Sequence, residues 1–312
     1  MKPPSDRASL TVGGQAVIEG VMMRAPGAWA VAVRQPDGAI TAMRNHLPRL
    51  TSRSRWARVP LVRGVLVLAE SLTLGFRALS WSAQKAAGEE EAPLSRGQIA
   101  GSMTMALAFF ALLFIVAPAA AARALTDDNN FGFAALEGTI QLGIFLGYLW
   151  LLGRSREISR VFAYHGAEHM AIHAYEAGDP LGSEHIAKYP PAHPRCGTSF
   201  LLLVMLLAII IFGLLGRLPL PQLIASRVIG IPVIAGLSYE MLRFAGTHQN
   251  NWFGRLMAKP GLWLQKLTTR VPDESQIEVA IASLLSSLEE EEVGEVLSRG
   301  PVPAPALAAR AR

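Results

Sequence analysis

The chain has 312 residues, of which 51% are hydrophobic and only 17% are charged, and its formal net charge is +5. This composition is too apolar for an ordinary soluble domain and indicates a membrane protein. The single cysteine, Cys196, excludes an intrachain disulfide and fits a reduced cytosolic thiol, and residues 1–10 lack the apolar core expected of a secretory signal.

The N-terminal region, residues 1–98, is predicted to be cytoplasmic and to contain a β-hairpin. Residues 29–34 and 39–43 have the composition of strands, and they flank Gln35-Pro36-Asp37-Gly38, an order of residues typical of a tight turn. Residues 13–24 indicate a loop that leads into another strand. A small β element therefore precedes the first membrane span.

Residues 60–84 predict an amphipathic helix. The segment is apolar except for Arg63, Glu70 and Arg77, which recur every seven residues and form one polar line. We expect this helix to lie in the cytoplasmic interface of the membrane. A fifth crossing is the alternative, and it would move one terminus to the other side.

Four apolar runs are long enough, or nearly so, to cross a hydrocarbon layer that needs ~20 residues per helix. They form two predicted transmembrane hairpins, within residues 99–152 and 199–242, with runs at 99–122, 131–152, 199–216 and 223–242.

Charged side chains interrupt two of these runs. Glu137 lies in the second together with Gln141, and Arg227 and Glu240 lie in the fourth. Charges in hydrocarbon are costly, so each is expected to face a partner or a cavity. An ion pair of Arg227 with a carboxylate is favoured over a transport relay through Glu137 and Glu240.

The basic residues predict the orientation of the chain. They are concentrated before the first span, between the second and third spans, and after the fourth. The connection between the first and second spans instead contains Arg123 together with the acidic residues Asp127 and Asp128. Basic residues favour the cytoplasmic side, so both termini should be cytoplasmic. This bias and anionic lipid headgroups explain the positive net charge better than nucleic acid does, and no nucleic-acid module is visible.

The C-terminal region, residues 243–292, predicts interfacial and amphipathic helices. Residues 252–267 mix tryptophan and leucine with basic residues, as suits the headgroup layer. Asp273 and Gln276 predict a capping box for a helix whose apolar stripe begins at Ile277. Residues 293–312 have the composition of a disordered tail.

The cytoplasmic connection, residues 153–198, contains a helix in which five potential ligands share one face. Their offsets of three, one, four and three residues gather them at about 100° per residue: His165, Glu168, His169, His173 and Glu176. In inverted-motif zinc peptidases, an HxxEH element supplies two imidazole ligands and a glutamate that deprotonates a metal-bound water. We therefore expect a divalent metal, with Zn²⁺ as the favoured ion, held by His165 and His169, and Glu168 as the base.

Further ligands lie close by, and a structural interpretation stays open. His173 follows on the helix, and His193 and Cys196 lie three residues apart in a proline-stiffened turn, so any of them can complete the metal shell. Alternatively, the imidazoles hydrogen-bond to carboxylates or backbone, Arg195 meets phosphate headgroups, and Cys196 is a buried, inert thiol.

Five blocks of the chain carry a resemblance to a known family. The blocks GGQAVIEGVMMRAP, YHGAEHMAIHAYE, HPRCGTSF, SYEMLRFAG and KPGLWLQKLTTRVPDESQIEVAIASL together resemble the YqhQ-like family of bacterial multi-pass membrane proteins. That family is described as uncharacterised and, by motif, as a predicted metal-dependent enzyme.

The resemblance implies a set of site residues, namely His165, Glu168, His169, His173, His193 and Cys196. Glu19 and Arg24, in the first block, are second-rank candidates, with Glu19 as a further catalytic carboxylate. No soluble peptidase domain surrounds the HxxEH element, so peptidase activity is not inferred.

These observations predict an α-helical integral membrane protein of the bacterial inner membrane, with about four transmembrane helices and a small cytoplasmic α+β portion. Its function would be that of a metal-dependent, hydrolase-like enzyme, acting at the membrane surface on a lipid, a membrane-linked intermediate or a membrane protein. The alternative is a non-catalytic scaffold or assembly factor that binds a protein partner. A transporter is the least favoured function.

Overall fold

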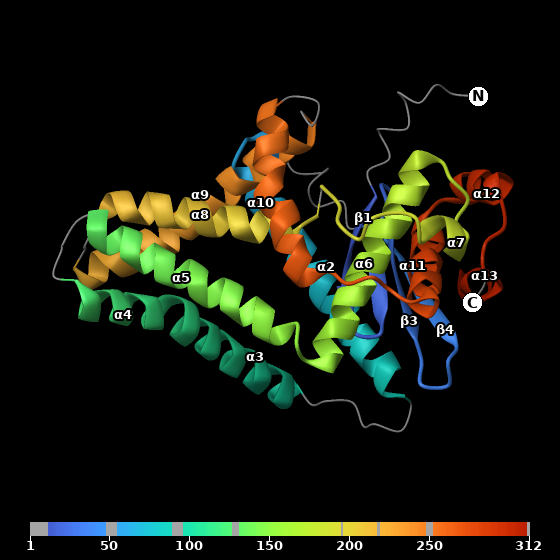
Figure 1. The fold of residues 1–312 in the computed structure, drawn as a ribbon, viewed down its shortest axis with the longest axis horizontal. Coiled ribbons are helices and arrows are strands. Elements are labelled where there is room, and N and C mark those ends of the chain that lie inside the picture. The colour runs from blue at the N-terminus through green and yellow to red at the C-terminus, as the bar shows by residue number, and fades with distance from the viewer. Residues whose placement is uncertain are drawn as a thin grey trace.

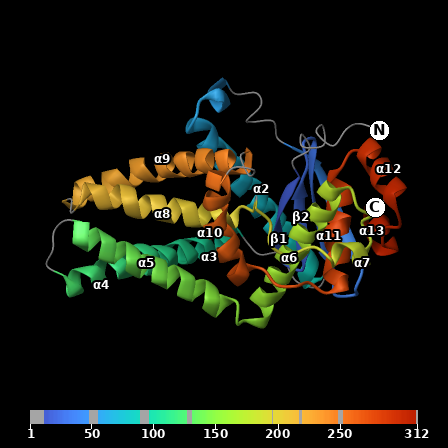
Figure 2. The ribbon, with the colours of Figure 1, turned by 45° about the horizontal axis from the view of Figure 1, so that its top comes forward.

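The computed structural model describes residues 12–47, 55–88, 96–126, 131–194, 196–216, 219–247 and 252–310. Long helices form one end of the molecule, and a small sheet with helices on both faces forms the other (Figures 1 and 2). The loop residues Asp127 and Asp128 lie outside the described residues.

The sheet has four antiparallel strands in the order β1-β2-β3-β4. Its strands are β1 (Gly13–Val17), β2 (Gly20–Arg24), β3 (Ala28–Arg34) and β4 (Ile40–His46). The predicted hairpin is confirmed as β3 and β4. Residues 13–24 form two strands instead of a loop and one strand, because Glu19 adopts a left-handed φ of 51° and the chain reverses between Val17 and Gly20.

Helices cover both faces of this sheet. Helices α6 (Arg156–Ala177) and α11 (Glu274–Ser287) pack on one face, and α2 (Val62–Ala87) packs on the other. Side chains alternate along the strands, so Val21 and Met23 join the core beneath α6 and α11, whereas Met22 joins the core beneath α2. The sheet is therefore buried on two sides.

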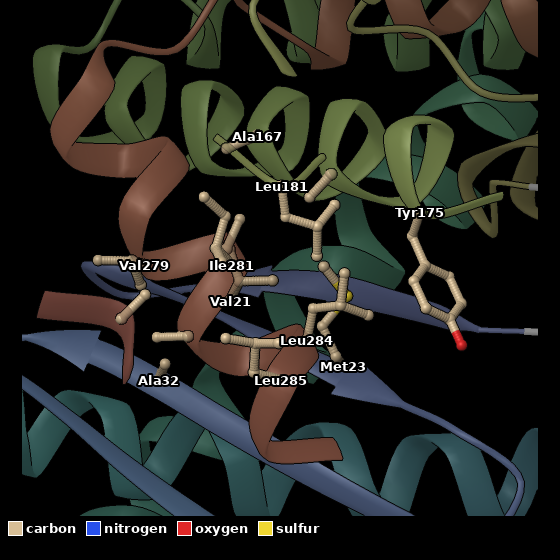
Figure 3. Packing of buried hydrophobic residues seen from close by; sticks show 14 of the residues in the cluster. Val21, Met23, Ala32, Ala167, Tyr175, Leu181, Val279, Ile281, Leu284 and Leu285 are labelled. Carbon is tan, nitrogen blue, oxygen red and sulfur yellow. The ribbon is translucent and has the colours of Figure 1, made fainter. Parts of the chain in front are cut away.

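Helix α11 fills the centre of the larger core. Figure 3 shows Ile281, Leu284 and Leu285 between the strands and α6, where all three are fully buried. The predicted capping box is confirmed: the Asp273 carboxylate accepts from the backbone N–H of Gln276 at 2.9 Å, and the Gln276 side chain accepts from the backbone N–H of Asp273.

Within the described parts of the chain, four helical segments are long and apolar enough to cross a membrane, as predicted: Ala100–Leu125, Gly132–Leu152, Thr198–Leu215 and Ala225–Ala245. The first combines α3 (Arg96–Ala111), the π-helical segment η3 (Leu112–Val116) and α4 (Ala117–Leu125). The others belong to α5 (Phe131–Leu152), α8 (Thr198–Leu215) and α9 (Leu220–Thr247).

The polar residue Gln141 satisfies a backbone group of the first span. Pro118 has no N–H to donate to the carbonyl four residues before it, that of Phe114. The side-chain amide of Gln141 on α5 donates to this carbonyl instead, at 3.1 Å. The polar residue thus replaces a missing backbone bond where water is scarce.

Three charged side chains within the candidate spans have an opposite charge nearby, namely Glu137, Arg227 and Glu240. Arg227 Nη2 lies 3.9 Å from Glu137 Oε1, and its guanidinium stacks over Phe212. Glu240 accepts a hydrogen bond from Arg63 Nε of α2 at 2.6 Å. These pairs agree with the expectation that such charges face a partner.

Helix α2 connects the bundle to the sheet. Its first turns pack closely on α9, where a Cβ at Gly64 would lie 3.0 Å from the Gly236 Cα, and its later turns bury Leu74 and Ala78 against the sheet. It is not among the described helices that are apolar enough to span a membrane. The short 3-10 helix η2 (Arg55–Arg58) precedes it. The predicted position of α2 in the cytoplasmic interface of the membrane stays a prediction.

The remaining helices in the described residues are α7 (Ser183–Ile186), α10 (Trp252–Thr268), α12 (Glu290–Arg299) and α13 (Ala304–Arg310). Residues 293–310 are thus largely helical, in contrast to the disordered tail expected from composition. Ala306 and Ala309 are buried against the core, and Arg310 Nε donates to the Leu285 carbonyl at 3.0 Å. Small alanines permit this close packing, which composition alone does not reveal.

The central position of α11 predicts a graded effect of leucine truncation. Leu284→Ala should lower the free energy of unfolding by about 2–5 kcal/mol, because it leaves a cavity in the shared core. Leu297→Ala, at a site that is 44% exposed, should change it by less than about 0.5 kcal/mol. Urea unfolding in mild detergent, followed by tryptophan fluorescence, measures both. Equal effects would contradict the assigned packing.

Candidate metal centre

Helix α6 presents its histidines on one face. It begins after Ser155 and ends at Gly178, whose left-handed φ of 78° closes the helix. The His165 and His169 rings lie one turn apart, with centroids separated by 4.4 Å. The helix expected within residues 153–198 is therefore present, and its imidazoles face the loop that precedes α8.

Three potential ligands come together at this face. His165, His169 and Cys196 each offer an atom, and these atoms all lie within 4.8 Å of one another. The closest pair is His165 Nε2 and Cys196 Sγ, 3.2 Å apart. This separation is close to that between neighbouring ligands of a tetrahedral metal with metal–ligand bonds of about 2.0–2.3 Å.

Backbone carbonyls orient both imidazoles. His165 Nδ1 donates to the Thr268 carbonyl at 2.9 Å, and His169 Nδ1 donates to the Pro191 carbonyl at 2.7 Å. Since a carbonyl only accepts, each Nδ1 carries a proton, which leaves His165 Nε2 to contact Cys196 Sγ and His169 Nε2 without a partner among the described residues. Metal-binding histidines commonly have this arrangement, with one nitrogen on the metal and the other bonded to a carbonyl.

Two buried polar atoms of this region lack a hydrogen-bond partner among the residues that the structure describes. They are His169 Nε2 and Glu168 Oε2, on residues that are only 1% and 4% exposed. An unpaired buried polar atom is costly and rare in folded proteins. Both atoms are therefore able to bind a further group at this position.

Burial dominates the electrostatics of the site. It raises the pKa of Glu168 to about 8, with a smaller, opposing effect of His165, and it raises the pKa of the Cys196 thiol. It lowers the pKa of His169 to about 2 and that of His193 to about 4. Burial thus holds His169 and His193 neutral, the form that binds metals.

Helix α10 fixes the loop that carries Cys196. The side chain of Gln265 accepts from the backbone N–H of His193 at 2.8 Å and donates to the His193 carbonyl at 2.9 Å. Cys196 lies two residues before α8, and its sulfur accepts from the Thr198 backbone N–H at 3.4 Å. The thiol is therefore placed by α10 on one side and by α8 on the other.

The other predicted ligands lie beside the cluster and have different contacts. His173 Nε2 donates to the Ala192 carbonyl at 3.0 Å, and its ring stacks on Tyr189. His193 Nε2 lies 3.6 Å from a carboxylate oxygen of Glu176. Among the described residues, the three-ligand group includes neither histidine. Arg195 lies outside the described residues.

The two second-rank candidates are engaged elsewhere. The Glu19 carboxylate binds the Arg160 guanidinium, which donates through Nε at 2.7 Å, and it accepts from Tyr164 Oη at 3.3 Å. Arg24 Nη2 lies 2.5 Å from Glu70, which is buried in α2. These pairs connect the sheet to α6 and to α2.

Sequence reasoning missed the role of strand β1 at the site. A Cβ at Gly14 would lie 2.3 Å from the Met22 carbonyl oxygen and 3.2 Å from Glu168 Cδ, and the Gly14 backbone hydrogen-bonds to the Glu168 carboxylate. The glycine pair at 13–14 was the only signal in the sequence, and such pairs usually mark turns. Glycine is needed here for close approach.

The donor set fits a divalent metal of borderline softness. Two imidazoles and a thiol converge, one imidazole nitrogen is unpaired among the described residues, and the carboxyl group of Glu168 lies beside them. Nitrogen and sulfur ligands in this combination suit Zn²⁺ and similar ions.

Comparisons with known proteins identify related chains. A family model described as "Protein of unknown function (DUF1385)" matches residues 59–290. The chain is also 33% identical over 304 residues to the "Uncharacterized protein YqhQ" of Bacillus subtilis (strain 168), which covers 91% of this chain and 94% of that protein. No solved structure matches.

Two neighbouring glycines of β1 offer a matched test of the site's packing. Gly14→Ala should displace β1 from Glu168 and destabilise the fold by about 1–3 kcal/mol, because its Cβ would meet backbone. Gly13→Ala should have little effect, since a Cβ there meets no atom within 4 Å. Thermal unfolding in detergent measures both, and a harmless Gly14→Ala would refute this close approach.

Proposed function

The chain belongs to the family described as proteins of unknown function (DUF1385), and from its geometry we propose that it is a metal-dependent, hydrolase-like enzyme at the cytoplasmic surface of the bacterial inner membrane. The observation that carries this proposal is the convergence of His165, His169 and Cys196, in which His169 Nε2 and the neighbouring Glu168 Oε2 are buried without a partner among the described residues.

The shared core supports the proposed topology. The sheet precedes the first candidate span, α6 follows the second, and α11 follows the fourth, yet all three contribute to one hydrophobic cluster. Segments that pack together lie on one side of a membrane, so each pair of spans must return the chain to the same side. The basic residues of these regions favour the cytoplasmic side.

The position of the site supports a substrate near the bilayer surface. Cys196 lies two residues before the candidate span Thr198–Leu215, and the adjacent His165 is only partly buried. A substrate that is a lipid, or is linked to the membrane, would reach this level without leaving the bilayer.

Different residues of the protein would have different roles in hydrolysis. His165 and His169 would hold the ion, with Cys196 as the third ligand, and a bound divalent ion would supply a Lewis acid. Glu168 lies next to these ligands, and a cation bound there would favour its ionised form, whose unpaired Oε2 would then take a proton and return it to a leaving group. The backbone N–H of Gly14 orients this carboxylate.

A scaffold function is the second candidate, and one observation favours it. An open groove of about 500 Å³ lies between α2 and strands β3 and β4, on the face of the sheet opposite the histidines. Trp29, Trp81, Phe76 and Arg77 are among its lining residues. A protein partner bound there would need no metal chemistry.

Metal content distinguishes the two candidates. Purified without a histidine tag, the protein should contain about one metal ion per chain, as measured by mass spectrometry. His165→Ala, His169→Ala and Cys196→Ser should each lose that ion, because each removes one of three ligands. His185→Ala on α7, outside the cluster, is the control and should retain it. An unchanged metal content in all four variants would refute the site.

Glu168→Gln tests catalysis separately from metal binding. The variant should retain the ion and lose at least about 10²-fold in turnover, because an amide cannot take the proton. Turnover is measured by mass spectrometry on membrane lipid extracts and on membrane-inserted peptides. Glu184→Gln, an exposed carboxylate on α7, is the control. Full activity in Glu168→Gln would contradict the assigned role.

A further inference from the structure

Helix α10 has two chemically different faces. Its inward face buries Leu264, Gln265 and Thr268. Its outward face exposes residues at spacings of four, three, four and three, which form one stripe along the helix: Trp252, Leu256, Lys259, Trp263 and Lys266. The stripe, here called the outer stripe, thus combines large apolar side chains with two cations.

The inward face contacts the candidate metal centre directly. Gln265 makes two hydrogen bonds to the main chain of His193, and the Thr268 carbonyl accepts from His165 Nδ1. Both contacts determine where ligands sit, one through the loop of Cys196 and the other through the orientation of an imidazole. A displacement of α10 would therefore change the geometry of the site.

The helix crosses the sheet-side ends of the membrane helices. In Figures 1 and 2, α10 runs across the ends of α8 and α9 instead of along them. The crossing is close at Gly261, where a Cβ would lie 1.9 Å from Ser199 Oγ in the first turn of α8. This places α10 at the level where the candidate spans leave the bilayer.

The outer stripe fits phospholipid headgroups. Trp263 is 62% exposed and Leu256 is 46% exposed, which is costly in water but favourable where acyl chains meet headgroups. Lys259 and Lys266 are exposed, and among the described residues neither forms an ion pair. Two unpaired cations on an apolar stripe complement anionic lipid.

We propose that the outer stripe of α10 binds anionic phospholipid, and that this contact holds Gln265 and Thr268 in the positions that form the metal centre. The second half of this proposal rests on the proposed function, and the first half does not. The membrane surface would thereby be a structural requirement for metal binding as well as the location of the substrate.

Lipid selectivity tests the first half. The delipidated full-length protein is titrated with phosphatidylglycerol or phosphatidylcholine, and bound lipid is counted by native mass spectrometry. The wild type should prefer phosphatidylglycerol. Lys259→Gln/Lys266→Gln should weaken its binding by roughly 10- to 30-fold, since each basic residue near an anionic surface contributes about 1 kcal/mol. Lys85→Gln/Lys188→Gln removes the same charge elsewhere and should retain the preference.

Metal affinity tests the second half. The metal dissociation constant is measured in nanodiscs of phosphatidylcholine with and without phosphatidylglycerol. We expect tighter binding with phosphatidylglycerol in the wild type and in the Lys85→Gln/Lys188→Gln control, but not in Lys259→Gln/Lys266→Gln. Gln265→Leu should keep the lipid preference and lose the lipid effect on metal affinity.

The outcomes separate the two proposals. Equal phosphatidylglycerol binding by the wild type and the Lys259→Gln/Lys266→Gln variant would overturn the lipid site and leave a protein partner as the occupant of the stripe. Equal metal affinity in both lipids would overturn the coupling. Absence of any metal, together with intact lipid selectivity, would refute the proposed function and the coupling but not the lipid site.

Discussion

Three distant segments of the chain form one hydrophobic core, and the rest of this structure depends on that constraint. The N-terminal sheet, α6 and α11 are separated in the chain by pairs of membrane helices, yet their side chains form a single cluster. Apolar burial of this kind is the main favourable term in folding. It brings the termini of the helical hairpins together and sets α6, α10 and the loop of Cys196 against one another.

Helix α6 has small residues where it packs closely on neighbouring segments, and its polar residues lie between them. A Cβ at Gly166 would lie 2.1 Å from the Arg270 carbonyl oxygen, so glycine is required where the helix meets the segment between α10 and α11. Ala167 and Ala171 are fully buried in the core. Close approach on these sides forces the intervening Glu168 and His169 into a buried environment, which shifts their pKa values.

The structural and the metal-binding interpretations of the histidines are compatible. The imidazoles do hydrogen-bond to backbone carbonyls, as the structural interpretation expects. For His165 and His169, however, the bonded atom is Nδ1, and Nε2 is left facing Cys196 or unpaired. The same carbonyl bonds that stabilise the fold therefore select the tautomer that a metal requires.

The sequence by itself determined the features that are local or compositional. The apolar runs determined four candidate spans, Pro-Asp-Gly determined the hairpin of β3 and β4, and the spacing of His165 and His169 determined their common face. Only the tertiary structure decided what meets this face: Cys196, the Thr268 carbonyl and Gly14 come from distant segments, and α13 is ordered by packing. Periodicity reports on neighbours within a helix or strand, whereas contacts between segments depend on the burial of the whole core.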